Sequence, residues 1–328
     1  MNEQFLFFCT NIGNESFLKE EIRIFHPELT LSYSRKGFIT FKNKGTPYDL
    51  EGLLQFKVTF ATRMGICLGK SNPDLLLESV TKSLAEFGVE INKCTIHSFS
   101  LNTDFCLESE KIFEKKVNEY SPINKTVIDV IALSDKEVWY GIHKVGKQTS
   151  HFPNSNPGIE IPKESPSRAY LKIAEAFESF NLNCDKSDQW LDFGSSPGGA
   201  SYFLLDKGFR VFGIDPAQTS SVVSNHPNYS HLSTPVQDLS QEELPEGIRW
   251  VNVELNLNPK QSIKEVLRLC KKYNFTLKGI LLTIQIIKID HVKNIENFEN
   301  HFYEWGFKEV VSCQLPSHKK EYVVFAKK

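Results

Sequence analysis

The chain has 328 residues, a formal net charge of −2 and a hydrophobic content of 40%. This length is typical of two or three domains, and the composition is that of an ordinary globular protein. No run approaches the roughly 18 apolar residues of a membrane span, so no membrane partner is expected. The first residues show no basic head and no small-residue cleavage site, so we expect no signal peptide and predict a cytoplasmic protein.

Cysteine and histidine usage gives no sign of a metal site or a disulfide framework. The seven cysteines are scattered without a C-x-x-C pair, and the nine histidines lack metal-ligand spacing. Reduced, mostly buried thiols are therefore expected, and no metal is predicted. The near-neutral net charge neither requires nor excludes a nucleic-acid partner.

The first half of the chain predicts two small α+β domains, at 1–57 and 58–155. Apolar periodicity and capping residues favour helices at 15–25, 49–56, 73–88 and 108–119. Strands are expected at 5–10, 36–42, 59–69, 94–101, 126–133 and 137–146, the last two as a hairpin. Residues 151–167 contain four prolines and few large apolar side chains, which is typical of a linker.

The second half, 156–328, alternates helices and strands, which predicts an α/β domain with a mostly parallel, doubly wound sheet. Helices are expected at 167–180, 197–208, 260–273 and 293–305. Strands are expected at 188–194, 210–215, 248–255, 278–287, 307–315 and 321–327. The last two strands leave no room for a helix between them, so they predict an antiparallel hairpin at the edge of the sheet.

The stretch WLDFGSSPGGA, at 190–200, places an acid and a glycine loop where a strand leads into a helix. Ligands of such sheets bind at the carboxyl ends of the strands. A dinucleotide fingerprint needs glycine at position 196, which is serine here. A phosphate-binding P-loop needs Gly-Lys-Ser/Thr, whereas Ala200 and Ser201 follow these glycines. A site for S-adenosylmethionine agrees better with the loop.

The predicted cofactor site combines the loop with two further acids. Asp192 would meet the ammonium of the cofactor, and the glycines would let the backbone approach its amino-acid tail. Asp215, about 20 residues on, would accept hydrogen bonds from the ribose hydroxyls, and Asp238 would cap the adenine edge. The simpler alternative is a tight turn with helix-capping acids. The full set is Asp192, Gly194, Ser196, Pro197, Gly198, Gly199, Asp215 and Asp238.

Segment 165–328 resembles the FtsJ-like ribose 2′-O-methyltransferases, through PSRAYLKIAEAF, DFGSSPGGASYFL, VFGID, IRWVNVELNLNP and CQLPSHKKEYVVFAKK. Within them it is most similar to the branch that methylates a cytidine of large-subunit (23S) ribosomal RNA, the RlmM type. The resemblance implies a Rossmann-like fold, S-adenosylmethionine as cofactor and RNA as substrate. The first half resembles the ancillary part of RNA-modifying enzymes, a ferredoxin-like unit followed by a THUMP-like RNA-binding domain, which KEVWYGIHKVGKQTSHF would end.

The family's active centre is a Lys-Asp-Lys-Glu tetrad, and the resemblance carries it to Lys172, Glu254, Gln285 and Glu321. Two positions depart from the family: glutamate replaces aspartate at 254, and glutamine replaces the second lysine at 285. Glutamine cannot accept a proton at neutral pH. Two carboxylates beside Lys172 would hold it protonated, which opposes a role as general base. Lys288 would substitute only if the strand ends or bulges there.

RNA is the expected partner, and a monomer is the expected state. Across the linker, Lys144, Lys147, Lys163, Arg168 and Lys172 outnumber Glu160 and Glu164, beside four aromatic or histidine side chains. Such a patch is suited to phosphates and unpaired bases, although an ordinary solvated surface has the same composition. Two functions stay open: an active RNA ribose methyltransferase, and a binding protein of the same fold that has lost catalysis.

Overall fold

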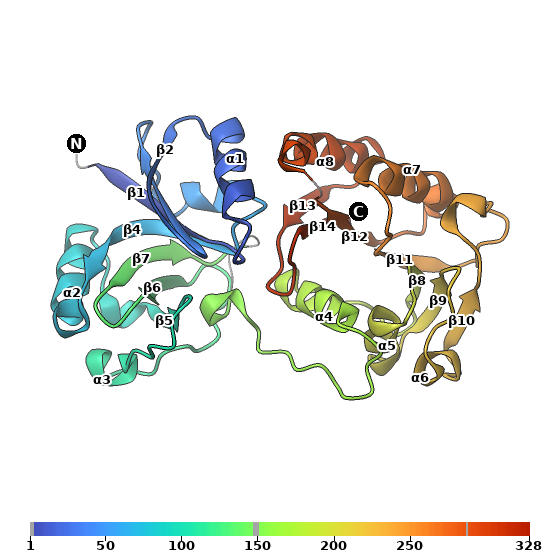
Figure 1. Cartoon of the computed structure of the whole chain (residues 1–328), viewed down its shortest axis with the longest axis horizontal. Helices are drawn as coiled ribbons and strands as arrows, with labels where there is room; N and C mark the ends of the chain where they lie inside the picture. Colours follow the sequence, from blue (N-terminus) through green and yellow to red (C-terminus); the bar gives the residue numbers. More distant parts are fainter. Residues whose placement is uncertain (1–2, 147–150, 287) are drawn as a thin grey trace. The chain divides into compact units, whose positions relative to one another are not determined.

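The computed structural model describes residues 3–146, 151–286 and 288–328 (Figure 1). The chain divides into two compact units, Met1–Pro157 and Gly158–Lys328, each with its own seven-stranded sheet. The boundary falls inside the proline-rich segment. Within the described residues, no helix is both long enough and apolar enough to cross a membrane.

The sheet of the first unit has the strand order β2-β3-β1-β4-β7-β6-β5. Its neighbouring strands pair antiparallel except β5 and β6, which are parallel. The strands are β1 (Gln4–Cys9), β2 (Leu29–Arg35), β3 (Phe38–Asn43), β4 (Arg63–Ser71), β5 (Thr95–Ser100), β6 (Thr126–Ala132) and β7 (Val138–Lys144). The helices are α1 (Glu15–Phe25), α2 (Leu76–Glu86) and α3 (Ser109–Phe113).

The division predicted at residues 57/58 does not separate two units in the structure. β4 pairs with β1 on one side and with β7 on the other, so strands from both predicted domains share one hydrogen-bonded ladder. Separating the two segments would leave the backbone groups of β4 unpaired along an edge. The structure therefore replaces the predicted domains 1–57 and 58–155 with a single unit.

Three local predictions in this unit also change. The helix expected at 49–56 is a single 3₁₀ turn, Gly52–Gln55. The helix expected at 108–119 ends at Phe113, because Glu114 adopts the left-handed conformation with φ of 49°. β2 was not predicted; it is an edge strand in which only Leu29 of seven residues is buried.

A buried charge cluster lies at the centre of this sheet. The side chains of Arg63 and Asp129 are fully buried, and the Arg63 guanidinium donates to Asp129 at 2.5 Å and to His97 Nδ1 at 2.5 Å. His143 binds the other Asp129 oxygen at 2.5 Å. Burial works to raise the pKa of Asp129, but Arg63 and His143 outweigh it and lower that pKa. The cluster ties β4, β5, β6 and β7 together.

The second unit has the strand order β10-β9-β8-β11-β12-β14-β13, with β14 antiparallel to both neighbours and the other pairs parallel. The strands are β8 (Gln189–Phe193), β9 (Arg210–Ile214), β10 (Tyr229–Leu232), β11 (Ile248–Val253), β12 (Gly279–Gln285), β13 (Glu309–Cys313) and β14 (Glu321–Lys327). The helices are α4 (Ala169–Ser179), α5 (Gly199–Asp206), α6 (Ser221–Ser224), α7 (Pro259–Cys270) and α8 (Ile295–Glu304).

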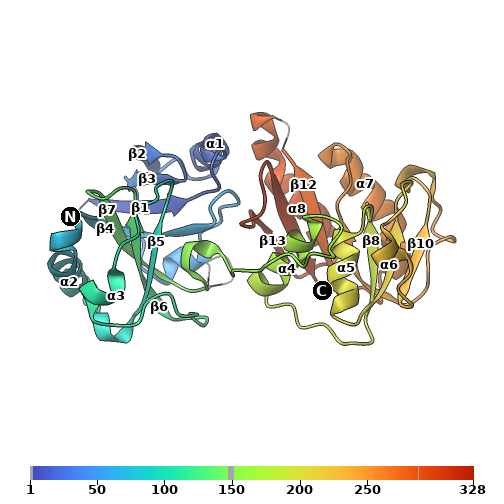
Figure 2. The same cartoon turned by 60° about the horizontal axis from the view of Figure 1, so that its bottom comes forward.

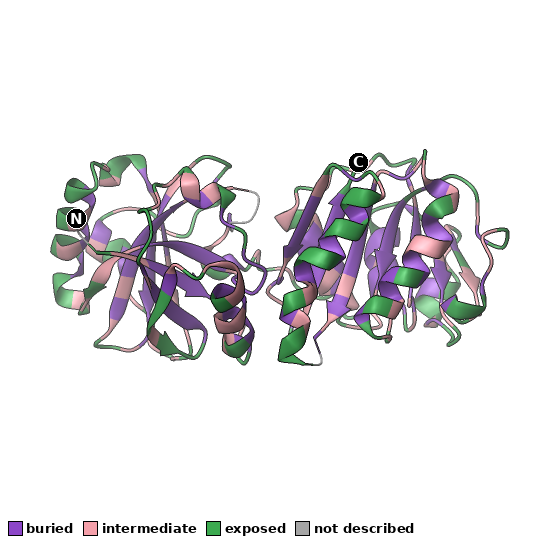
Figure 3. Ribbon diagram, turned by 90° about the horizontal axis from the view of Figure 1, so that it is seen from above, coloured by how far each residue is buried: buried purple, intermediate pink, exposed green. Residues whose placement is uncertain are grey.

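Helices cover both faces of this second sheet. α4, α5 and α6 lie on one face and α7 and α8 on the other (Figures 1 and 2). The strands between them are buried, and each helix turns its exposed side outward (Figure 3). Trp190 of β8 stacks on Trp250 of β11 with ring centroids 5.4 Å apart, under Phe177 of α4. The predicted α/β class, doubly wound arrangement and antiparallel C-terminal hairpin are confirmed.

Removing one partner of the buried charge cluster should lower the free energy of unfolding of the first unit. In Arg63→Met the Asp129 carboxylate stays buried without its cation, so unfolding of the first unit should become easier by about 3–5 kcal/mol. Urea denaturation followed by circular dichroism measures this. Lys93→Met, which removes an exposed pair with Glu90, is the control and should change little. Equal effects of the two substitutions would contradict a stabilising role for the cluster.

Candidate active site

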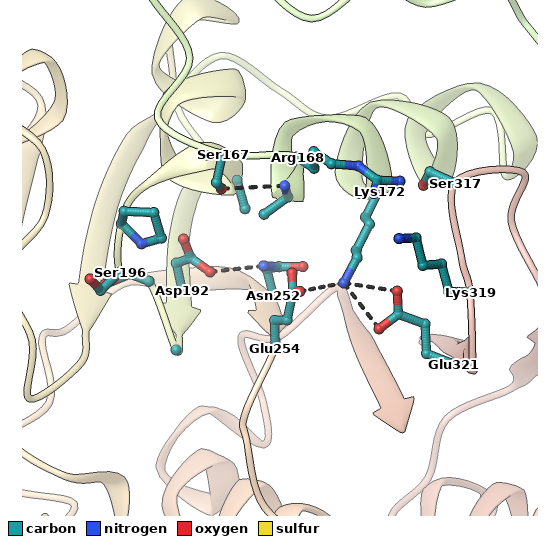
Figure 4. Close-up of a pocket in the computed structure, with 16 residues that line it drawn as sticks. Ser167, Arg168, Lys172, Asp192, Ser196, Asn252, Glu254, Ser317, Lys319 and Glu321 are labelled. Atoms are coloured by element: carbon teal, nitrogen blue, oxygen red, sulfur yellow. Dashed lines mark hydrogen bonds and ion pairs between the residues drawn. The ribbon is translucent and has the colours of Figure 1, made fainter. Parts of the chain in front are cut away.

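A cavity of about 390 Å³ opens in the second unit at the carboxyl ends of β8 and β11 (Figure 4). Helix α4, the loop after β8 and the segment before β14 complete its wall. Its lining residues are Ser167, Arg168, Ala169, Lys172, Asp192, Gly194, Ser195, Ser196, Pro197, Gly199, Ala200, Asn252, Glu254, Ser317, Lys319 and Glu321. The edge of the sheet predicted to hold the ligand therefore carries a pocket.

The glycines of the loop are required by the protein's own packing. Gly194 has φ of +77°, and a Cβ added there would lie 2.2 Å from the backbone oxygen of Glu254. A Cβ on Gly199 would lie 2.3 Å from Ser167 Oγ, in the segment before α4. We predicted that these glycines make room for a ligand; the nearest atoms in the structure belong to the residue after β11 and to the segment before α4. The loop is thus held against the parts of the chain that carry two of the four tetrad residues, Glu254 and Lys172.

Asp192 lies at the floor of the cavity, 1% exposed. Ser201 donates to its Oδ2 at 2.6 Å and Asn252 donates to its Oδ1 at 2.8 Å. Burial raises the pKa of Asp192 to about 6, even though these two hydrogen bonds act to lower it. The carboxylate is ionised at neutral pH in a place that disfavours negative charge, and a cation in the cavity would relieve that cost.

The other predicted cofactor residues divide into two groups. Asp215 is half-buried behind the loop, where its Oδ2 accepts the backbone N–H of Ser196 at 3.2 Å. Neither Asp215 nor Gly198 lines the cavity, and Asp238 is exposed in a short turn away from it. The structure thus brings Asp192, Gly194, Ser196, Pro197 and Gly199 together at the cavity, with Asp215 in contact with the loop.

Lys172 stands between two carboxylates. Its ammonium donates to Glu254 Oε1 in a short contact and lies 3.0 Å from both carboxylate oxygens of Glu321. The three side chains are between 13% and 27% exposed. Burial works to lower the pKa of Lys172, but Glu254 and Glu321 outweigh it and raise that pKa above the ordinary lysine value. Lys172 is therefore held as a cation.

Gln285 is the last residue of β12 and lies directly opposite Glu321 in the antiparallel ladder. Side chains of directly opposed residues share a face of the sheet, so Gln285 is a neighbour of the carboxylates, although it is not one of the lining residues. The strand ends at Gln285, and Lys288 lies exposed beyond it, outside the lining set. The position that the family resemblance gives to the second lysine thus carries an amide.

Sequence reasoning missed several polar residues of the cavity wall and named Arg168 only as part of the basic patch; the missed ones are Ser167, Ser195, Asn252, Ser317 and Lys319. Asn252 anchors Asp192, and Arg168, Ser317 and Lys319 add donors at its mouth. Asn252 is a polar residue inside a buried strand, WVNVE, which is the signal that would have found it. Within the described residues, no group of three or more His, Cys, Asp or Glu is arranged to hold a metal ion.

The packing role of Gly194 can be tested by adding one methyl group. Gly208 also has a left-handed φ, +85°, but a Cβ there would meet only the end of a lysine side chain at 3.9 Å. Gly208→Ala should therefore cost about 1–2 kcal/mol of unfolding free energy, the cost of the conformation alone. Gly194→Ala should cost about 1–3 kcal/mol more, because a backbone carbonyl must move. Urea denaturation followed by tryptophan fluorescence would show this, and equal costs would contradict it.

Comparison with known proteins finds a family match within this unit. Residues 166–324 match the model of the FtsJ-like methyltransferases. The protein named Ribosomal RNA large subunit methyltransferase M from Laribacter hongkongensis (strain HLHK9) is 30% identical over 107 residues, covering 31% of this chain and 30% of its own length. Its namesake from Pseudomonas entomophila (strain L48) is 24% identical over 204 residues, covering 58% and 55% respectively.

The chain thus spans about a third to just over half of the length of these relatives. Among solved structures, TrmN from Thermus thermophilus aligns with 99% of this chain and 100% of its own at 12% identity, with a TM-score of 0.35. The family match begins just before α4 and ends within β14, so it contains every residue that lines the cavity. The resemblance read from the sequence is confirmed for this part: residues 166–324 match the FtsJ-like methyltransferases.

Proposed function

We propose that the protein is an S-adenosylmethionine-dependent methyltransferase that acts on a ribose 2′-hydroxyl of RNA. Large-subunit ribosomal RNA is the target that the names of the relatives suggest, and the sequence resemblance implies a cytidine within it. The observation that carries this proposal is one pocket, inside the family-matched segment, that joins the Asp192 loop to the Lys172 centre. A cofactor half and a catalytic half therefore face the same space.

The residues on the Asp192 side of the pocket, its cofactor half, are suited to hold S-adenosylmethionine, which supplies an electrophilic methyl group when bound. The buried Asp192 carboxylate would attract the cofactor's ammonium. The backbone of Gly194, Ser196 and Pro197 would lie along its amino-acid tail, and Asp215 would reach the ribose past Ser196. The segment of Asp238 is bound by Arg268 of α7, which donates to the backbone oxygens of Val236 and Leu239, and Asp238 stays a prediction as the adenine contact.

The Lys172 side of the pocket, its catalytic half, is suited to hold a polyanion. Arg168 and Lys319 are exposed at the mouth of the cavity, near the cationic Lys172 (Figure 4). Exposed cations beside a reactive centre attract and orient phosphates of a nucleic-acid backbone. Lys172, paired with two carboxylates, would position the target hydroxyl and stabilise negative charge that develops on its oxygen.

The first unit stays a predicted RNA-binding region. Of its share of the basic patch, Lys144 pairs with Glu51, and Lys147 lies outside the described residues. The pocket does not test four predictions, which stay predictions. They are RNA binding by this unit, its THUMP-like assignment, a cytoplasmic location and a monomeric state. A catalytically inactive binding protein is the alternative, and no feature of the pocket favours it.

The cofactor half predicts a measurable affinity with a defined pH dependence. Calorimetry should detect binding of S-adenosylmethionine, and Asp215→Ala should weaken it by about 1–3 kcal/mol, as for a lost hydrogen bond to a charged group. Asp206→Ala, at the far end of α5, is the control and should bind as the wild type does. Affinity should fall as the pH drops below about 6, because protonation removes the charge of Asp192. No binding by the wild type would refute the cofactor proposal.

The substrate is tested by methyl transfer to RNA. Ribosomal RNA extracted from a strain without the gene should accept labelled methyl from S-adenosylmethionine, and mapping should place it on a ribose 2′-oxygen. RNA binding should weaken steeply with salt, and more so for the whole chain than for segment 158–328 if the first unit contributes phosphate contacts. Cofactor binding without transfer to any RNA would favour the inactive binding protein.

A further inference from the structure

Methyl transfer to a ribose hydroxyl releases that hydroxyl's proton, and the pocket must contain an acceptor for it. This question rests on the proposed function. In the family, as the sequence resemblance implies, a lysine would accept the proton. Here the second lysine position is Gln285, which cannot, and Lys172 is held as a cation by Glu254 and Glu321. The acceptor in this chain must be another group.

The nearby histidine is unsuited to this role. His318 lies beside Lys172 and is 2% exposed. Its Nδ1 accepts the backbone N–H of Leu315 at 3.2 Å, so that nitrogen is already occupied. Burial, followed by the charge of Lys172, lowers the pKa of His318 to about 3. His318 is also absent from the residues that line the main cavity, so it does not face a hydroxyl held there.

The other lysines are poorly placed. Lys288 is exposed beyond the end of β12 and does not line the cavity. Lys319 does line it, but on the side of Glu321, with Lys172 between it and Asp192 (Figure 4). A methyl group delivered from the cofactor half would reach the Lys172 centre before it reached Lys319.

Glu254 has the required position. It follows β11 directly, and its backbone N–H donates to the oxygen of Phe193 at 2.9 Å, which fixes it beside the glycine loop. Its charge acts on Asp192, at the floor of the cofactor half. Lys172 binds Oε1, and among the described residues the structure shows no partner for Oε2. A carboxylate oxygen is therefore available between the two halves of the pocket.

We propose that Glu254 is the proton acceptor of this enzyme, with Lys172 as the permanent cation that orients it. The 2′-oxygen forms a bond to the methyl carbon while the carbon–sulfur bond breaks, and sulfur keeps that electron pair and becomes a neutral thioether. The hydroxyl proton passes to Glu254 Oε2 and then to solvent. The extra methylene of glutamate, relative to the family's aspartate, extends this oxygen toward the hydroxyl.

The pH dependence of the transfer step separates a carboxylate acceptor from a lysine. The charged and titratable groups that line the main cavity with Glu254 are Arg168, Lys172, Asp192, Lys319 and Glu321, and His318 lines a smaller neighbouring cavity with it. The pKa of His318 is lowered to about 3 and that of Asp192 is raised to about 6. Both groups therefore titrate below the range from about pH 7 to about pH 9. Within it, an ionised carboxylate gives a constant rate, whereas a lysine that must lose its proton gives about a tenfold rise per pH unit.

The experiment measures single-turnover methyl transfer by the whole chain at saturating S-adenosylmethionine. We expect a nearly constant rate over that pH range. Glu254→Gln should slow transfer by about 10²–10⁴-fold, while calorimetry shows cofactor affinity retained. Glu321→Gln removes the other carboxylate partner of Lys172 and is the matched variant, which should lose less. Added formate should partly restore Glu254→Ala and leave Glu321→Ala unchanged.

Each outcome decides the assignment. A tenfold rise per pH unit in the wild type, or a Glu254→Gln variant as fast as the wild type, would overturn it. Equal losses in the Glu254 and Glu321 variants without rescue by formate would mean that both carboxylates only position Lys172. If the wild type binds the cofactor but transfers no methyl to any RNA, the proposed function itself fails, and the assignment fails with it.

Discussion

The close contact between the glycine loop and the end of β11 is the constraint on which the rest of the site depends. The backbone of Gly194 lies against the carbonyl of Glu254, and the N–H of Glu254 donates to Phe193. These contacts fix the direction in which the Glu254 side chain leaves the sheet. In that direction it meets Lys172 from α4. The geometry of the charged centre is therefore set by backbone packing, at positions that carry no charge.

Lys172 shows how burial and charge compete at this centre. Partial burial alone would favour the neutral amine, which is the form a general base needs. Two carboxylates within hydrogen-bond distance reverse that preference. The same three side chains would behave differently with a second ammonium at position 285, because each carboxylate would then be shared between two cations. The replacement of that lysine by glutamine thus changes the role of its neighbours as well as its own.

Much of the second unit could be predicted from the sequence, because its helices and strands have clear apolar patterns and its site residues stand at the ends of strands. Lys172, Glu254 and Glu321 meet as predicted from the family resemblance. β10 was missed because it has only four residues, and β2 because it is a mostly exposed edge strand. The single sheet of the first unit depends on pairing between β1 and β4. These strands lie far apart in the chain, and local sequence patterns do not indicate which distant strands pair. The packing partners of Gly194 and Gly199 are equally non-local.

The glycines of the loop have a consequence for how such sequences diverge. Because Gly194 and Gly199 are required by contacts with Glu254 and Ser167, selection for folding alone would preserve them. A descendant that had stopped binding any cofactor would keep the same loop for as long as it kept the same sheet. Asp192 is bound in the same way to the protein itself, through Ser201 and Asn252. In this fold a preserved glycine loop and its acid therefore record the packing of the sheet before they record a ligand.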